Sequence, residues 1–305
     1  MHVITEHIPG TGIRMSSHRG EYIFGISAMS NPGVQYTNEE EVDICAAFIR
    51  FYTARSQFSS IPVIEKEDSV HFGEIQNYDG PIYKFISEND WNRFYSKGSI
   101  KIDRVETYTT LEYGKGPLDA WEGFGISFVW DGNRTSPILF RNNPAAHIFC
   151  ASTCGEPSKE MDERFGNCVI RIANPDKFFQ IMAKKTNTKF LSNKIVEYTS
   201  CKAIRYEEPL FGIRCSQFMK RYIRNGKYYL RGNDRKFFLK MLDRSHDVSI
   251  FCKPKRVVSV DGGGTPKCFD FEKEARAIFY SDVNQRGALF TGECEELAGL
   301  IERVR

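Results

Sequence analysis

The sequence contains no long hydrophobic run and no paired-cysteine motif. None of its apolar stretches reaches the roughly 18 residues that a membrane-spanning helix needs, so we expect a cytoplasmic protein with no membrane partner. The first residues lack the basic and apolar segments of a signal peptide. The nine cysteines are odd in number and include no Cys-x-x-Cys pair, which is typical of cytosolic proteins with buried thiols.

Motifs for metal binding and for hydrolysis are also missing. His147, Cys150 and Cys154 lie close in the sequence, but a fourth ligand and a second ligand pair are absent, so we expect no metal. No Ser-His-Asp or Cys-His arrangement occurs at a recognisable spacing, which argues against a hydrolase. The net charge of +3 is too small to indicate a nucleic-acid partner by itself.

The composition that remains is that of a large globular protein. The chain has 305 residues, of which 41% are hydrophobic and 27% charged. Strand patterns outnumber helical patterns and are not separated by regular crossover helices, which predicts an α+β fold rather than a doubly wound sheet. A polar, glycine-punctuated stretch ends near residue 80. We therefore expect an N-terminal extension over residues 1–78 and the main domain over 79–305.

Local signals predict individual elements. Thr37-Asn38-Glu39-Glu40 is a capping box that opens an amphipathic helix to about Phe58. Asn174-Pro175 predicts a second helix, to about Lys185. We also expect one long strand over 195–206 and a final helix over about 293–303.

The stretch from Phe269 to Tyr280 is the one around which we organise the functional interpretation. It alternates at first and then becomes almost continuously apolar, which predicts a strand that enters a core. Glu272, Glu274 and Arg276 occupy every second position, so a strand places them on one face. Three such charges indicate either a solvated outer face or one wall of a polar cleft.

The order of these segments resembles a prokaryotic family known as domain of unknown function 2971. The resemblance covers about residues 81–280, and one motif departs from it, because a proline that is usual in the family is absent from Leu118–Gly123. The segments that carry the resemblance are Ile82–Phe85, Lys97–Gly98, Leu118–Gly123, Phe149–Ser152, Cys168–Ile170, Ile204–Tyr206 and Phe271–Arg276.

The same layout looks like a divergent ADP-ribosyltransferase, a fold with a split mixed β-sheet core and peripheral helices. The resemblance implies a basic or His residue on the first strand, a position that falls here on Lys84 or, alternatively, on Tyr83. It implies a Ser/Thr pair, Ser152-Thr153, at the end of a middle strand, and a catalytic glutamate on a late strand, Glu274. Lys84 departs from the pattern, because arginine is usual there and its planar fork binds phosphate oxygens in pairs.

The resemblance implies NAD as a substrate and assigns roles to these residues. Glu274 would stabilise the positive charge that develops on the ribose, and Ser152 would align it. Glu272, one pleat away, would orient or deprotonate the acceptor. Arg276 would hold the glutamates or a cofactor phosphate. Tyr83, Lys84 and Thr153 would also contribute to NAD binding.

Two further stretches have alternative interpretations. Trp121 either forms a wall that stacks on the nicotinamide or anchors its own loop by being buried. The strip 220–236 interleaves basic and aromatic residues. It suits either a groove for single-stranded nucleic acid or a hairpin around Asn225-Gly226 with solvated charges.

We therefore expect an NAD-dependent transferase that modifies a macromolecular acceptor, either protein or nucleic acid, as toxins and phage-defence effectors of this fold do. Such a toxin would have an antitoxin partner. The alternatives are a catalytically inactive relative that binds a nucleotide or a partner, and an RNA-binding protein that uses the strip 220–236.

Overall fold

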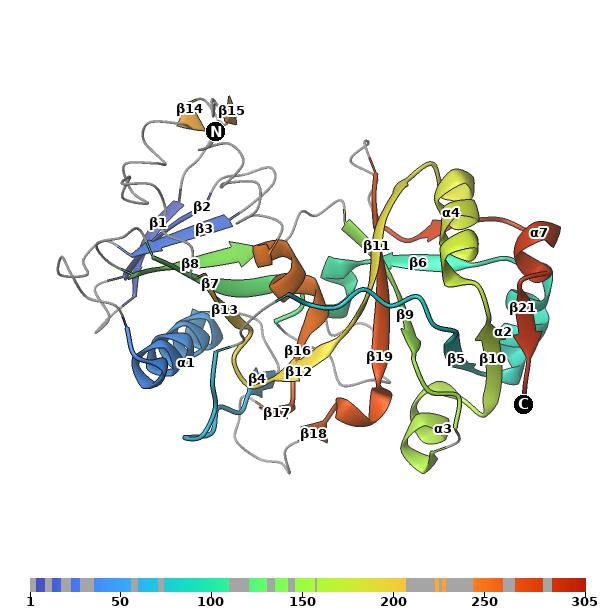
Figure 1. The fold of residues 1–305 in the computed structure, drawn as a ribbon, viewed down its shortest axis with the longest axis horizontal. Helices are drawn as coiled ribbons and strands as arrows, with labels where there is room; N and C mark the ends of the chain where they lie inside the picture. Colours follow the sequence, from blue (N-terminus) through green and yellow to red (C-terminus); the bar gives the residue numbers. More distant parts are fainter. Residues whose placement is uncertain are drawn as a thin grey trace. The chain divides into compact units, whose positions relative to one another are not determined.

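The computed structural model describes most of the chain, and the fold is mixed α+β with mostly antiparallel sheets (Figure 1). No helix among the residues described is long and apolar enough to cross a membrane. The described ranges are 4–8, 13–17, 23–27, 36–55, 60–70, 74–109, 121–130, 135–141, 146–156, 158–206, 223–224, 227–228, 244–259, 267–281 and 287–305.

The chain divides into two compact units, each built from three separate segments. Unit 1 comprises residues 1–74, 119–143 and 198–267, and unit 2 comprises residues 75–118, 144–197 and 268–305. The expected boundary after residue 78 lies close to the observed one after residue 74. The expected continuous domain over 79–305 is corrected, because its residues are shared between both units.

Unit 1 contains helix α1 and several small sheets, of which β7 pairs with β8 antiparallel and with β13 in parallel. Residues 244–251 are also helical. The elements are β1 (Ile4–Ile8), β2 (Ile13–Ser17), β3 (Ile23–Ser27), α1 (Asn38–Arg55), β4 (Ser60–Pro62), β7 (Phe124–Trp130), β8 (Thr135–Arg141), β12 (Glu197–Thr199), β13 (Ala203–Tyr206), β14 (Ile223–Arg224), β15 (Lys227–Tyr228), β16 (Cys252–Pro254), β17 (Arg256–Ser259) and β18 (Lys267–Cys268).

The predicted helix at Thr37 is confirmed, and it forms part of the unit 1 core. Thr37 and Glu40 make both bonds of the capping box, since the Thr37 N–H donates to the Glu40 carboxylate and the Glu40 N–H donates to the Thr37 hydroxyl. On the opposite side of the helix, Val42, Cys45 and Phe48 pack with residues of β7 and β13. Helix α1 is therefore integral to this core.

Unit 2 contains an eight-stranded sheet with the order β11-β19-β9-β5-β10-β21, in which β6 joins β9 and β20 joins β6. Its elements are β5 (Ile82–Ile86), α2 (Glu88–Arg93), η1 (Tyr95–Lys97), β6 (Lys101–Arg104), η2 (Val105–Thr109), β9 (Ala146–Ser152), α3 (Lys159–Phe165), β10 (Cys168–Ile172), α4 (Pro175–Thr186), β11 (Lys189–Ile195), η3 (Asp270–Glu272), β19 (Glu274–Tyr280), β20 (Leu289–Phe290), α7 (Glu295–Ala298) and β21 (Ile301–Arg303).

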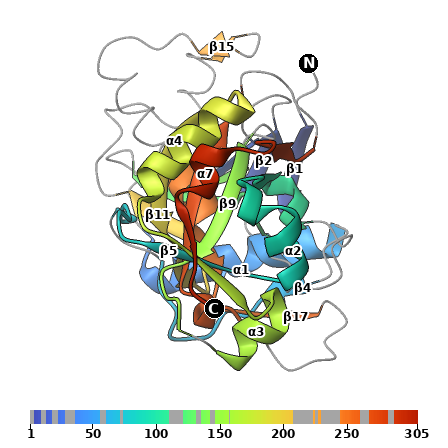
Figure 2. The ribbon, with the colours of Figure 1, turned by 90° about the vertical axis from the view of Figure 1, so that its right-hand side faces the viewer.

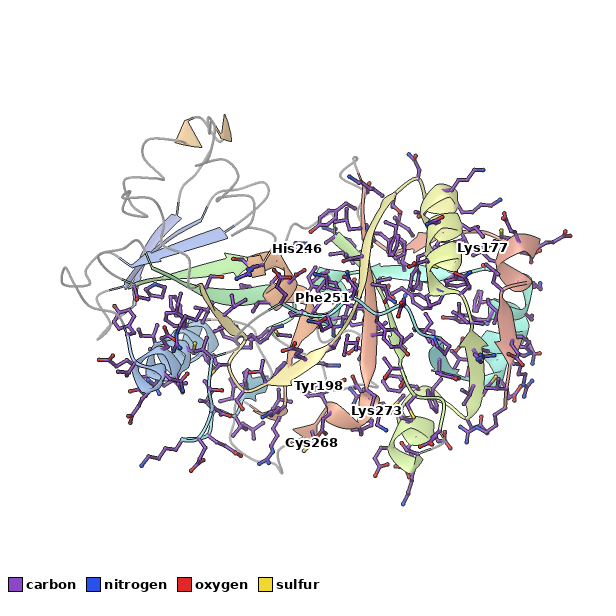
Figure 3. All side chains as sticks on the ribbon, in the orientation of Figure 1. Lys177, Tyr198, His246, Phe251, Cys268 and Lys273 are labelled. Carbon is purple, nitrogen blue, oxygen red and sulfur yellow. The ribbon has the colours of Figure 1, made fainter. Side chains whose placement is uncertain are left out.

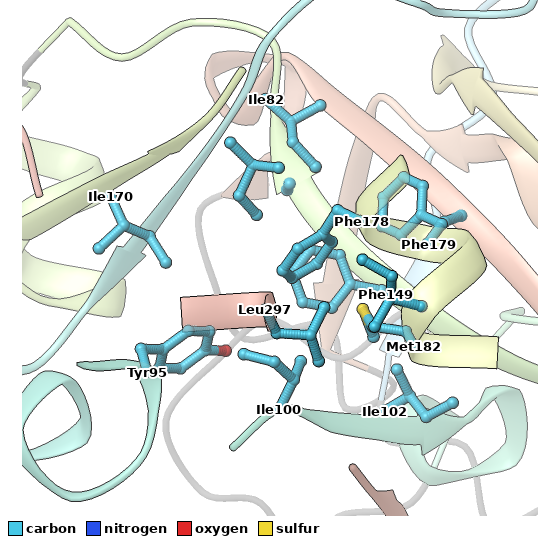
Figure 4. Close-up of a cluster of buried hydrophobic side chains, with 14 of the residues drawn as sticks. Ile82, Tyr95, Ile100, Ile102, Phe149, Ile170, Phe178, Phe179, Met182 and Leu297 are labelled. Carbon is cyan, nitrogen blue, oxygen red and sulfur yellow. The ribbon is translucent and has the colours of Figure 1, made fainter. Parts of the chain in front are cut away.

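One face of this sheet carries the hydrophobic core of unit 2. Helix α4 lies against the sheet with α7 beside it (Figure 2). Phe178, Phe179 and Met182 of α4 pack on Phe149 of β9, and Leu297 of α7 closes the cluster (Figure 4). Alternate residues of β9 and β19 therefore point into this core, and the residues between them point to the opposite face.

The sheet is split at strand β9. β5 and β6 both pair with this strand, β5 through Tyr83 opposite Ser152 and β6 through Asp103 opposite Ile148. Cys150 lies between these two pairs. The split places the end of β9, at Ser152, between β5 and β19.

Two predicted elements are wrong in part. The long strand expected over 195–206 is three strands, because the Thr199 hydroxyl donates to the Cys201 carbonyl and accepts from the Cys201 N–H, which turns the chain. The final helix expected over about 293–303 is the short α7 followed by β21, which pairs with β10. The helix predicted after Asn174 is confirmed as α4, and the Asn174 side chain caps it.

Candidate functional site

Three of the expected site residues form a row across adjacent strands of unit 2. Tyr83 of β5 is the register partner of Ser152 of β9, and Ser152 is the register partner of Glu274 of β19. Directly opposed residues of antiparallel strands share a face. The row lies on the face opposite the α4 core, since Ala151 and Ala275, the neighbours of Ser152 and Glu274, belong to that core.

Glu274 forms a buried ion pair with Arg276 on the same strand face. The Arg276 Nε donates to one carboxylate oxygen of Glu274 at 2.6 Å, and Nη2 approaches the other oxygen at 3.3 Å. The two residues are only 5% and 2% exposed. A solvated outer face is therefore excluded for this pair.

Ser152 and Thr153 fix the end of β9. Ser152 is buried, and its hydroxyl accepts a hydrogen bond from the Cys154 N–H at 3.1 Å. The Thr153 N–H and hydroxyl both donate to the Lys273 carbonyl, at 2.8 and 3.0 Å. Thr153 therefore joins the end of β9 to the residue immediately before Glu274. This residue, Lys273, lies next to the start of β19 (Figure 3).

Glu272 requires a correction, because it does not lie one pleat from Glu274. Residues Asp270–Glu272 form a 3-10 turn, and Lys273 follows in the left-handed conformation with φ 42°, so the strand begins only at Glu274. Glu272 is buried and forms an ion pair with Arg164 of α3 at 2.7 Å. The alternating sequence concealed a turn.

Lys84 also lies apart from the row. Its register partner is Ile170, a residue of the α4 core, and its ammonium group lies 4.6 Å from the centre of the Phe149 ring. The ammonium donates to the Cys150 carbonyl at 2.6 Å, between the pairs that join β9 to β5 and to β6. Lys84 thus supports the split of the sheet from the core face, rather than facing Glu274.

Trp121 lies in the core of unit 1, and it is only 3% exposed. Its ring packs edge-on against Phe124 with 5.7 Å between the ring centres, and its carbonyl accepts a bond from the Lys202 ammonium at 2.7 Å. This burial favours the second interpretation, in which the tryptophan anchors its own loop.

Two residues that the sequence did not single out for this site also lie near Glu274. Cys150 is the register partner of Arg276, and burial raises the pKa of its thiol, with the negative charge of Glu274 adding to the rise. Burial also raises the pKa of Tyr108 in η2, helped by Cys150, Asp103 and Glu274 and opposed by Arg276. Only the structure brings these groups together, because they come from different elements.

Two remaining points from the sequence concern metal binding and the strip 220–236. Within the described ranges, no group of three or more potential metal-ligating side chains is found. The strip 220–236 lies outside the described residues except for β14 and β15, which pair as a hairpin on either side of Asn225-Gly226.

The arrangement can place a carboxylate, a hydroxyl and an aromatic ring side by side on a rigid sheet.

A scan against protein-family models finds no match to this chain. Searches of curated proteins and of solved structures also find no match.

Proposed function

We propose that unit 2 is an ADP-ribosyltransferase-like catalytic unit that transfers ADP-ribose from NAD to a macromolecular acceptor. The observation that supports this proposal is the row Tyr83–Ser152–Glu274, which runs in register across β5, β9 and β19. The resemblance in the sequence requires these residue types on neighbouring strands of a split sheet.

In this proposal Glu274 supplies the central chemistry. The bond between nicotinamide and ribose breaks, nicotinamide leaves with the bonding electrons, and positive charge develops on the ribose. The Glu274 carboxylate, fixed at the start of a buried strand, stabilises that charge. The acceptor nucleophile then forms a bond to the same ribose carbon and loses its proton to solvent water.

Ser152 and Tyr83 position the substrate in this scheme. The Ser152 oxygen accepts one backbone hydrogen bond, which leaves its own proton to donate to a substrate oxygen or to Glu274. Tyr83 presents a ring on the same face, and Gly155 lies so close to this ring that a Cβ there would meet it at 2.4 Å. Glycine at position 155 therefore gives the ring the space it occupies.

The biological setting stays a proposal of the same kind. An enzyme of this class would act in the cytoplasm as a toxin or phage-defence effector, and an antitoxin partner would restrain it. The acceptor would be a protein or a nucleic acid.

A second candidate is a catalytically inactive relative that binds a nucleotide or a partner at the same face. Two observations favour it. Glu272 is held by Arg164 and is not placed to activate an acceptor, and Lys84 faces the core instead of the Glu274 face. Such a protein would retain binding through Tyr83 and Arg276 without transfer.

Labelled NAD distinguishes the two candidates. The wild-type protein, incubated with labelled NAD and a cell lysate, is expected to label protein or nucleic acid, and Glu274→Gln is expected to abolish the label. Glu163→Gln, at an exposed position of α3 in the same unit, is the matched control and should label like the wild type. Equal labelling by wild type and Glu274→Gln would contradict the site. NAD binding without any labelling would establish the inactive relative.

A further inference from the structure

The ion pair between Arg276 and Glu274 engages the group on which the proposed reaction depends. Both side chains project from one face of β19, two positions apart, and their contact at 2.6 Å is almost completely shielded from water. A charge-assisted contact of this kind is strong, and burial reduces its screening. The carboxylate that has to stabilise a cationic ribose is therefore already neutralised by an arginine.

Other charged groups lie near the pair. Asp103 of β6 affects the groups on this face and forms its own ion pair with Lys101 at 2.8 Å. Lys84 interacts electrostatically with both Asp103 and Glu274. Moving Arg276 away from Glu274 would break a buried ion pair, so such movement is favoured when another anion takes the arginine.

The diphosphate of NAD is an anion of the required kind. A guanidinium group binds phosphate oxygens in pairs, as it binds a carboxylate. Lys84 is the cation that the sequence assigns to the phosphates, but it faces the core and donates to the Cys150 carbonyl. Arg276 is on the Glu274 face, and its guanidinium contacts the Glu274 carboxylate at 2.6 Å.

We propose that the Arg276–Glu274 pair is a substrate-operated latch. In the free protein Arg276 holds Glu274, and the diphosphate of NAD draws the guanidinium away and leaves the carboxylate charged beside the ribose. This inference rests on the proposed function and adds to it how the site is regulated. It makes the diphosphate a trigger as well as a binding group.

The latch makes an unusual expectation for Glu274→Gln. A neutral amide holds Arg276 less strongly than a carboxylate does, so the arginine becomes more available to phosphate. Glu274→Gln is therefore expected to bind ADP-ribose more tightly than the wild type, by about fivefold or more, although transfer is lost. If the ion pair only stabilised the strand, Glu274→Gln would not increase the affinity for ADP-ribose.

Isothermal titration of the full chain with two ligands tests the proposal. ADP-ribose carries the diphosphate, and nicotinamide riboside lacks it. The expected result is that Glu274→Gln binds ADP-ribose more tightly than the wild type does, whereas its affinity for nicotinamide riboside is unchanged. Arg276→Lys keeps the positive charge but loses the planar guanidinium group. It should lower the affinity for ADP-ribose by about tenfold or more and leave the affinity for nicotinamide riboside unchanged. Arg305→Lys, which alters an exposed pair with Asp162, is the control.

Each other outcome overturns a different statement. If the wild type binds neither ligand, the proposed function fails and the latch fails with it. If the wild type binds both ligands and Glu274→Gln, folded by circular dichroism, binds ADP-ribose no more tightly, the latch alone is wrong. If the variants do not fold, a wild-type structure with ADP-ribose decides. Arg276 should then contact a phosphate, and an arginine that still holds both Glu274 oxygens would refute the latch.

Discussion

At the scale of single residues, the ammonium group of Lys84 contributes to the response of unit 2 to pH. Loss of water around this group lowers its pKa, while electrostatic interactions with Cys150, Asp103 and Glu274 oppose the shift and Lys101 adds to it. Lys84 is thus more easily deprotonated in the folded protein than in the unfolded chain, where lysine has a pKa of about 10.4.

The sign of the resulting effect follows from proton binding. Between the lowered pKa and the ordinary lysine pKa, the unfolded chain holds a proton that the folded protein has released, so the contribution of Lys84 to stability rises with pH. Below the lowered pKa the contribution is constant. We expect the difference in unfolding free energy between wild type and Lys84→Met to increase towards pH 10 in urea titrations. A difference that is independent of pH would contradict this assignment.

A second residue-scale prediction concerns two glycines with almost the same positive φ angle. Gly98 has φ 67° and Gly292 has φ 69°. A Cβ at position 98 would lie 2.0 Å from the Cys294 carbonyl oxygen, whereas a Cβ at position 292 meets nothing within 4 Å. Gly292→Ala should therefore cost only the backbone strain, about 1 kcal/mol.

Gly98→Ala has to bear the same strain and the clash with the backbone at Cys294. We expect it to lower the unfolding free energy by at least about 2 kcal/mol more than Gly292→Ala does. Urea unfolding of the two variants measures the difference directly. Equal destabilisation would mean that the backbone near Cys294 yields to the added methyl group.

At the scale of elements, the turn before β19 sets where Glu274 begins its strand. Arg164 of α3 holds Glu272 by the ion pair at 2.7 Å, and its guanidinium lies 5.0 to 5.4 Å from the ring centres of Phe165, Phe269 and Phe271. Cations over aromatic faces gain further stabilisation. Helix α3 therefore positions the catalytic candidate through this turn.

Removing Arg164 tests how much its ion pair with Glu272 contributes to stability. Arg164→Ala leaves the Glu272 carboxylate buried without the arginine, and we expect a loss of about 3 kcal/mol in unfolding free energy. Lys159→Ala removes the exposed contact with Glu163 on the same helix and should change stability by less than about 0.5 kcal/mol. Similar losses in both variants would show that the Arg164 contact is not special.

How much of these elements is readable from sequence depends on the range of the signals. The capping box at Thr37 and the Asn174-Pro175 start gave correct helices, because the atoms that cap them lie within three residues. Glu272 misled us because a 3-10 turn and a strand are compatible with the same alternation, and Arg164, which selects the turn, is far away in the sequence. Tyr83, Ser152 and Glu274 were predicted together only through a family resemblance.

At the scale of the whole molecule, the division into discontinuous units changes what a truncated chain should do. Helix α1 supplies Val42, Cys45, Phe48 and Ile49 to the core that β7 and β13 share. Burial of each such side chain contributes about 1.5–3 kcal/mol, and a domain has only about 5–15 kcal/mol in total. A chain reduced to residues 79–305 therefore loses more apolar burial in unit 1 than it can replace.

Hydrogen exchange tests this expectation strand by strand. In the chain reduced to residues 79–305, the amides of β7 should exchange almost freely, while those of β5, β9 and β19 remain protected as in the full chain. The full-length protein provides the reference. If the amides of Phe124–Trp130 were equally protected in both chains, the result would support the continuous domain over residues 79–305 that we expected from the sequence.

The position of β19 in the sheet has a consequence for synthesis. Its two neighbours, β9 and β11, precede it in the chain by many residues, and β19 lies between them. On the ribosome both neighbours present open edges until residues 274–280 emerge, and open strand edges invite pairing with other chains. The last long strand to be made is thus also the one that completes the Ser152–Glu274 row, so a partly synthesised chain carries no assembled site.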